Sequence, residues 1–201
     1  NSPSFSTTAL TDGQTVSCSV TATPTCPLTS GVTLGTGTSL SSTTSGLASA
    51  YPSYYGNGRQ QYLIRASELT GLGFTSGPIN SLGFTINGTL GDPDTLNGYT
   101  IKMALVAATT LNSTFQAPTF TTVYGPVNYL PALSSLNTHT FTTPFTWNGT
   151  SNVLIDICFS NQVVGITGYQ SYYSTSSFVS TTYYQADDAA GAGACTQASS
   201  T

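Results

Sequence analysis

Charged side chains are scarce in this sequence, and basic ones are the scarcest. Charged residues make up 5% of the 201 positions, against about 25% in an average soluble domain. Three Lys and Arg against seven Asp and Glu give a formal net charge of −4, so we expect no binding to nucleic acid or to an anionic membrane surface. Solubility must depend on Ser, Thr, Asn, Gln and Tyr, which suits an extracellular β protein that contacts neutral polar surfaces.

Long apolar segments are missing as well. No run approaches the ~18 residues that a membrane-spanning helix requires, and no secretory signal opens the chain. We therefore expect no membrane insertion, and we interpret the Asn-Ser-Pro-Ser-Phe start as that of a mature or excised piece. With 38% hydrophobic and 11% aromatic residues, the chain does not have the composition of a disordered protein, which combines low hydrophobicity with high net charge.

The sequence also lacks a metal-binding pattern of Cys and His. Cys18, Cys26, Cys158 and Cys195 include no C-x-x-C pair, and His139 is the one histidine. Zinc is therefore not expected, and disulfides in an oxidising compartment explain the even number better. Three pairings are open; we favour Cys18 with Cys26 and Cys158 with Cys195. The second closes a loop of several tens of residues, worth roughly 3–4 kcal/mol in the chain-entropy model.

What the sequence does contain is strand periodicity, strongest in residues 138–161. Large apolar residues alternate over 153–159, with Leu154, Asp156 and Cys158 on the opposite face, which predicts a core strand. The residues of the apolar face are Val153, Ile155, Ile157 and Phe159. A second strand is expected just before it, with Phe145 and Trp147 closing one end of the core.

Further strands are expected at intervals of about 10–20 residues, with Gly, Pro and Asn turns between them and no helical period beyond one turn at 67–69. They lie at 61–67, 79–87, 99–107, 119–124 and 177–184. This pattern predicts an all-β antiparallel sandwich, and long strands with uneven loops favour a jelly-roll-like version. We assign the sandwich to residues 50–201, after a Gly/Ser/Thr linker at 31–49.

Residues 1–30 form a detached N-terminal segment in this interpretation. Apolar and polar residues alternate over 14–23, as in a single strand, and a single strand does not fold alone. Three arrangements are open: addition to the main sheet, completion of an immunoglobulin-like module whose earlier strands are missing, or pairing with another molecule.

Chemically active motifs are weak. Asp92 and Asp94, in a D-P-D-T-L-N-G loop, are the best calcium candidates, but the loop is out of step with an EF-hand and lacks its terminal Glu. We favour a plain turn and expect no cofactor. No paired carboxylates and no G-x-S-x-G motif accompany His139, so we expect no catalysis. Arg65 and Glu68 should form a local ion pair, with Asp156 as a candidate third member.

Tyrosines are the best candidates for contacts with glycans or surfaces, because each offers a flat apolar face with a polar tip. Coverage of edge strands explains them equally well. The candidates are Tyr51, Tyr54, Tyr55, Tyr169, Tyr172 and Tyr173.

Two motifs carry a resemblance to a known family: R-Q-Q-Y-L-I-R-A-S-E-L at 59–69, and P-F-T-W-N-G-T-S-N followed by an apolar run to Cys158. With them, residues 50–195 resemble a β-sandwich module that is repeated in very large surface proteins of gliding, type IX-secreting bacteria. Residues 1–30 resemble the last strands of the immunoglobulin-like repeats that often precede it. The chain departs from the module at Asn148, where Asp is usual, and lacks a following R-P-N-I strand.

The resemblance implies a cell-surface stalk or adhesive unit, not an enzyme. Its partners would be other modules of the same protein, identical subunits, glycans or abiotic surfaces. Asp94-Thr95-Leu96 resembles the O-glycan acceptor site of those bacteria, which implies modification of Thr95. Two alternatives stay open: a self-assembling filament or sheath subunit in which residues 1–49 donate a strand to a neighbour, and an accessory carbohydrate-binding domain of a secreted enzyme.

Overall fold

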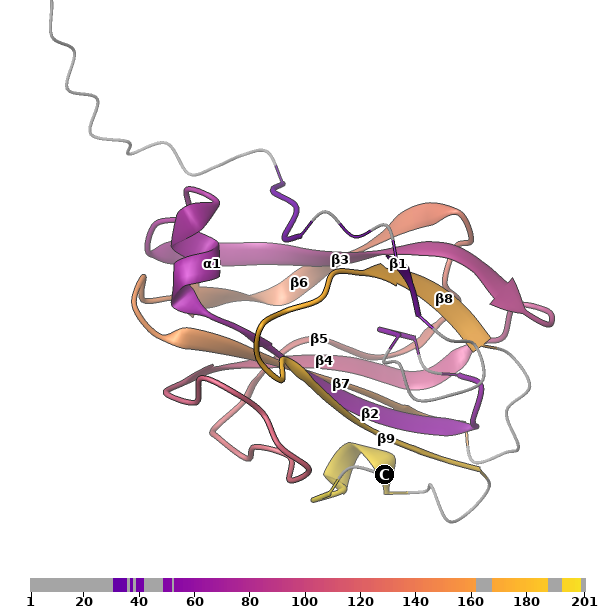
Figure 1. Ribbon diagram of the computed structural model, residues 1–201. Helices are drawn as coiled ribbons and strands as arrows, with labels where there is room; N and C mark the ends of the chain where they lie inside the picture. Colours follow the sequence, from indigo (N-terminus) through magenta and orange to yellow (C-terminus); the bar gives the residue numbers. More distant parts are fainter. Residues whose placement is uncertain are drawn as a thin grey trace, which may run out of the picture.

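The computed structural model describes residues 31–35, 37, 39–41, 49–51, 53–161, 168–187 and 193–199. In this part of the chain two antiparallel sheets of four and five strands pack face to face (Figure 1). The expected all-β sandwich is therefore confirmed. The strand expected at 14–23, and with it Cys18 and Cys26, lies outside the described residues.

Each sheet combines strands from distant parts of the chain. The four-stranded sheet has the order β1-β8-β3-β6, with β1 Ser39–Leu40, β8 Gly168–Tyr173, β3 Gly77–Leu90 and β6 Ser135–Trp147. The five-stranded sheet has the order β5-β4-β7-β2-β9, with β5 Thr121–Tyr129, β4 Leu96–Val106, β7 Asn152–Ser160, β2 Asn57–Ile64 and β9 Thr181–Ala186. The helix α1, Ala66–Gly71, follows β2, and the short 3-10 helix η2, Ala194–Thr196, lies near the C-terminus.

The strand order is that of a jelly roll. β1 pairs with β8, β2 with β7, β3 with β6 and β4 with β5, all antiparallel. The first of these eight strands thus pairs with the last, the second with the seventh, the third with the sixth and the fourth with the fifth. Two Greek keys produce this pairing in a double-sheet jelly roll. β9 is a ninth strand, added to the free side of β2.

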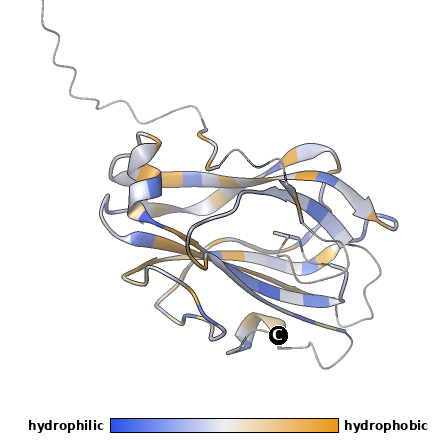
Figure 2. Ribbon diagram, in the orientation of Figure 1, coloured by the Kyte–Doolittle hydropathy of each residue, from blue (hydrophilic) through white to orange (hydrophobic). Residues whose placement is uncertain are grey.

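The core lies between the sheets, and the alternating face of β7 supplies its centre as the sequence predicted. Val153, Ile155, Ile157 and Phe159 all belong to the main apolar cluster. Phe145 and Trp147 are buried beside them, and the indole N–H of Trp147 donates to the Ser151 carbonyl oxygen at 2.7 Å. Hydrophobic and hydrophilic bands alternate along the strands in Figure 2, as expected when one face of a sheet is buried.

Two strands were not anticipated from the sequence. Ser39–Leu40 fall in the stretch assigned to a linker, yet they pair with Tyr172 and Tyr173 of β8. β8 itself has a mixed Gly, Tyr, Gln and Ser composition without apolar alternation, so periodicity did not reveal it. The sandwich therefore begins before residue 50 and uses part of the Ser/Thr-rich stretch.

Candidate functional site

The four-stranded sheet is uncharged along its whole length. None of the four described strands contains Asp, Glu, Lys or Arg. Its one ionisable imidazole, that of His139, faces the core and is fully buried. Because the outward positions hold only neutral side chains, the outer face of this sheet has no fixed charge.

Hydroxyl groups and small residues dominate that outer face. Antiparallel pairing sets Ser81 opposite Thr140, Gly83 opposite Thr138, Thr85 opposite Leu136 and Pro78 opposite Thr146. All eight residues are exposed. Directly opposed side chains start about 4.5–5.5 Å apart, so the Ser81 and Thr140 hydroxyls form one closely spaced pair. Each of the other three pairs contributes a single Thr hydroxyl to the face. We refer to these eight residues, together with Tyr172, as the neutral face.

Of the tyrosines predicted to contact glycans or surfaces, Tyr172 is the one that is exposed on the neutral face. The side chain is 41% exposed on β8, and its hydroxyl donates to Asn87 Oδ1 on β3 at 2.9 Å. Leu136, at 61% exposure, is the most exposed large apolar residue of the described chain. The face therefore offers apolar contact as well as hydrogen bonds.

Two of the predicted contact tyrosines are instead core residues. Tyr51 is fully buried; its ring stacks on Tyr99 at a centroid distance of 5.5 Å, and its hydroxyl lies 2.8 Å from His139 Nε2. Tyr169 is buried beneath the 92–95 loop, where its hydroxyl accepts from the Asp94 N–H at 2.9 Å and donates to the Asp94 carbonyl oxygen at 2.8 Å. Burial raises the pKa of Tyr169 to about 12. Neither side chain can reach a surface ligand.

The remaining candidates do not gather into one surface. Tyr54 and Tyr55 form an edge-to-face pair at 5.2 Å in the turn before β2, and both are partly buried. Tyr173 is partly buried on β8, opposite Ser39. Of the six tyrosines, Tyr172 alone is classed as exposed.

His139 lies among aromatic rings, and no carboxylate of the described residues forms an ion pair with it. Its ring contacts Tyr124 and Tyr129 at centroid distances of 4.6 and 4.7 Å, and Nδ1 has no hydrogen-bond partner in the described structure. Burial lowers its pKa from 6.5 to about 4. Asp156 faces away from the core on the other sheet, so the two side chains do not form a catalytic pair.

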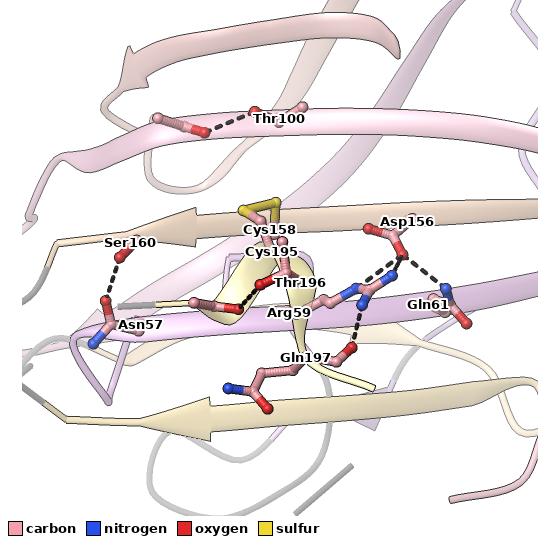
Figure 3. The surroundings of a disulfide bond; sticks show 12 residues. Asn57, Arg59, Gln61, Thr100, Asp156, Cys158, Ser160, Cys195, Thr196 and Gln197 are labelled. Atoms are coloured by element: carbon pink, nitrogen blue, oxygen red, sulfur yellow. Dashed lines mark hydrogen bonds and ion pairs between the residues drawn. A yellow bond between two sulfur atoms is a disulfide. The ribbon is translucent and has the colours of Figure 1, made fainter. Parts of the chain in front are cut away.

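The buried charges occupy the opposite side of the molecule, on the outer face of the five-stranded sheet. Asp156 Oδ2 accepts from Arg59 Nε at 3.0 Å, Arg59 Nη2 at 2.5 Å and Gln61 Nε2 at 2.7 Å (Figure 3). The Arg59 guanidinium also lies 4.5 Å from the Phe115 ring centroid and donates to the Gln197 carbonyl oxygen. These contacts are structural, because the covering segments leave the pair almost no access to solvent.

The expected Arg65–Glu68–Asp156 ion pair is not formed. The Arg65 guanidinium donates to the Thr109 carbonyl oxygen and stacks on Phe178 at 3.6 Å. Glu68 accepts instead from the backbone N–H of Arg65 at 2.8 Å, at the start of α1. The prediction failed because Asp156 is directly paired with Gln61 across the β2–β7 ladder, which brings it next to Arg59, not Arg65.

The predicted Cys158–Cys195 disulfide is confirmed, with an S–S distance of 2.00 Å. It ties η2 to β7 beside the Arg59–Asp156 pair (Figure 3). A disulfide indicates a non-reducing environment. Among the described residues, no helix has the length and apolarity to cross a bilayer.

The acidic loop is organised by protein contacts. Asp94 Oδ1 accepts from the Thr95 N–H at 2.7 Å, and Asn161 Nδ2 donates to the Thr95 carbonyl oxygen at 2.9 Å. In the described chain, Asp92 and Asp94 are not brought together with a third Asp, Glu, His or Cys as a metal site would require. The Thr95 side chain is partly buried.

Comparison of the chain with protein-family models, with curated proteins and with solved structures returned no match. Function must therefore be inferred from the residues of this chain.

Proposed function

We propose that this chain is a non-enzymatic extracellular module that binds neutral polar surfaces or glycans through the neutral face of β8, β3 and β6. The observation that carries the proposal is the absence of charge from a whole exposed sheet. The resemblance to adhesive surface modules supports the same class of function, and the Cys158–Cys195 disulfide is compatible with an extracellular location.

A neutral face suits a neutral surface because contact requires removal of water from both sides. Desolvation of a charged side chain is costly unless it finds a partner, and an uncharged polysaccharide or hydroxylated solid offers none. Thr and Ser hydroxyls both donate and accept hydrogen bonds, so they can pair with a sugar hydroxyl that acts as an acceptor or as a donor. The Thr methyl groups, Leu136 and Tyr172 add apolar contact. Binding of this kind depends little on salt, since no ion pairs form.

Adsorption to surfaces of defined charge tests the proposal. The disulfide-bonded protein should adsorb to hydroxyl-terminated monolayers and insoluble neutral polysaccharide, with little change between low and high salt. Thr140→Glu places a charge in the middle of the neutral face and should weaken adsorption at least about tenfold. Thr122→Glu is the matched control, because Thr122 is exposed on β5 in the other sheet.

Equal adsorption of the Thr140→Glu and Thr122→Glu proteins would contradict the assignment of the face. Preferential adsorption to charged monolayers that disappears at high salt would contradict the proposal that the protein binds neutral surfaces.

A further inference from the structure

A groove of about 670 Å³ opens at one edge of the sandwich and borders the neutral face at Thr146. One wall comes from the end of β4 and the segment leading into β5, and the other from the second half of β6. Every residue that lines it is uncharged. Its volume is within the range of small-molecule sites, about 300–1,000 Å³.

A large irregularity in β6 contributes to the wall of the groove. Ile79 of β3 pairs with Phe145, and Ser81 pairs with Thr140, so residues 141–144 of β6 oppose the single residue Asn80. Extra residues of this kind bend a strand and redirect its side chains, and they are common beside binding sites. Here the bulged segment carries Thr143 and Pro144 to the wall of the groove.

The chemistry of the lining combines free hydroxyls with apolar surface. Thr119 and Thr121 lie on one wall, Thr143 and Thr146 on the other. Their side chains make no hydrogen bond with another described residue, in contrast to neighbouring Thr142, whose hydroxyl donates to the Val123 carbonyl oxygen at 3.2 Å. The four hydroxyls are therefore available to a ligand as donors and acceptors.

Apolar side chains lie between the hydroxyls. Met103 and Phe145, from the two facing sheets, are buried, and Leu105 is 37% exposed. Pro118 and Pro144 stand on opposite walls, and their fixed φ angles limit the backbone freedom that binding would otherwise remove.

We propose that this groove binds a short neutral saccharide. Uncharged hydroxyls around apolar contacts match the ring hydroxyls and C–H faces of a sugar. A phosphorylated or carboxylated ligand would find no counter-charge in the lining. This is a soluble-ligand site at the edge of the sandwich, and of its lining residues only Thr146 also belongs to the neutral face. Either site can therefore fail without the other.

Titration of the isotopically labelled, disulfide-bonded protein with neutral di- to tetrasaccharides of glucose, xylose, mannose and N-acetylglucosamine tests the groove. At least one should shift the amide signals of the groove residues, with a Kd of about 1 mM. Thr121→Val and Thr143→Val remove a hydroxyl and keep the shape, and each should weaken binding about fivefold. The matched control, Thr140→Val on the neutral face, should bind as the unchanged protein does.

Three results would overturn the saccharide assignment. One is no groove response to any sugar at about 20 mM, well above the expected Kd. Another is unchanged affinity in both Thr→Val variants, whose folding is checked by their amide spectra. The third is a groove response to an uncharged Ser/Thr hexapeptide but to no sugar. If the first result is accompanied by shifts confined to β3 and β8, the groove is refuted but the proposed function stands.

Discussion

The stability of this protein should fall as the pH is lowered from 7 to 5, because of one buried histidine. His139 is fully buried among tyrosines, and burial holds its pKa near 4 in the folded state against 6.5 when exposed. Between those values the unfolded chain binds a proton that the folded chain does not. Stability conferred by the neutral imidazole is therefore complete above pH 6.5 and is lost as the pH falls toward 4.

The size of the effect follows from the two pKa values. Each pKa unit corresponds to about 1.4 kcal/mol, so the loss approaches about 3 kcal/mol below pH 4 and is about 2 kcal/mol at pH 5. That is a large share of the 5–15 kcal/mol typical of a domain. Urea denaturation followed by tyrosine and tryptophan fluorescence at pH 7.5, 6 and 5 should show it as a falling midpoint at constant slope.

Two substitutions test whether His139 causes the pH dependence of stability. His139→Phe keeps an aromatic ring and removes the titration, so most of the pH dependence between 7.5 and 5 should disappear. It leaves the Tyr51 hydroxyl without its partner, at a pH-independent cost of about 1–3 kcal/mol. Tyr51→Phe is the control: it removes the same hydrogen bond but keeps the imidazole, so the pH dependence should remain. A His139→Phe protein with the same pH dependence as the unchanged one would refute the reasoning.

Three further predictions concern stability. Replacement of Cys158 and Cys195 by Ser should lower the free energy of unfolding by roughly 3–4 kcal/mol, and a reducing agent should bring the unchanged protein to the same denaturation midpoint. Arg59→Met should cost about 3–5 kcal/mol because it leaves the Asp156 carboxylate buried alone, and adding Asp156→Leu should recover most of that loss in a double-mutant cycle. Gly125→Ala should lower the thermal midpoint markedly, since Gly125 has φ +79° and a Cβ there would lie 2.1 Å from a β4 carbonyl oxygen; a Gly88→Ala control, with no atom within 4 Å of its Cβ, should change little.

Much of the fold could be predicted from the sequence because buried strands of a sandwich have a strict period of two. Residues 153–159 show this best: one face fills the core, and the other holds Asp156 and Cys158. β1 and β8 could not be found in this way. Their sequences, Ser-Leu and Gly-Tyr-Gln-Ser-Tyr-Tyr, show no apolar alternation. They are held by pairing with each other and with β3, which is a property of the tertiary fold.

The candidate site was harder to predict because composition does not show which tyrosines face outward. Tyr51 precedes the first long strand in a Ser/Gly/Tyr-rich stretch that resembles a surface loop, yet its ring fills the core. The neutral face has a signal in the sequence, the Thr-x-Thr-x-Thr alternation at 138–142, but by itself this pattern indicates only a strand. Its meaning appears once β3 is placed beside it, because Ser81 and Thr85 then extend the row of outward positions.

The two outer faces of this sandwich differ in charge and in exposure, and the difference supports the proposed binding surface. The charged residues of the described strands, Arg59, Lys102 and Asp156, are all in the five-stranded sheet. That sheet is covered by the segment between β4 and β5 and by the disulfide-bound C-terminal turn, so β7 is buried on both sides. In the described part of the chain, the residues of the neutral face on the four-stranded sheet are exposed, and β6 alternates between buried and exposed positions along most of its length. The exposed apolar side chains of Leu136 and Tyr172 lie on the face through which we propose that the protein binds. Since that face has no charge to offer, a partner that requires an ion pair would bind it poorly. A neutral, hydroxylated partner requires no ion pair, so we expect it to bind.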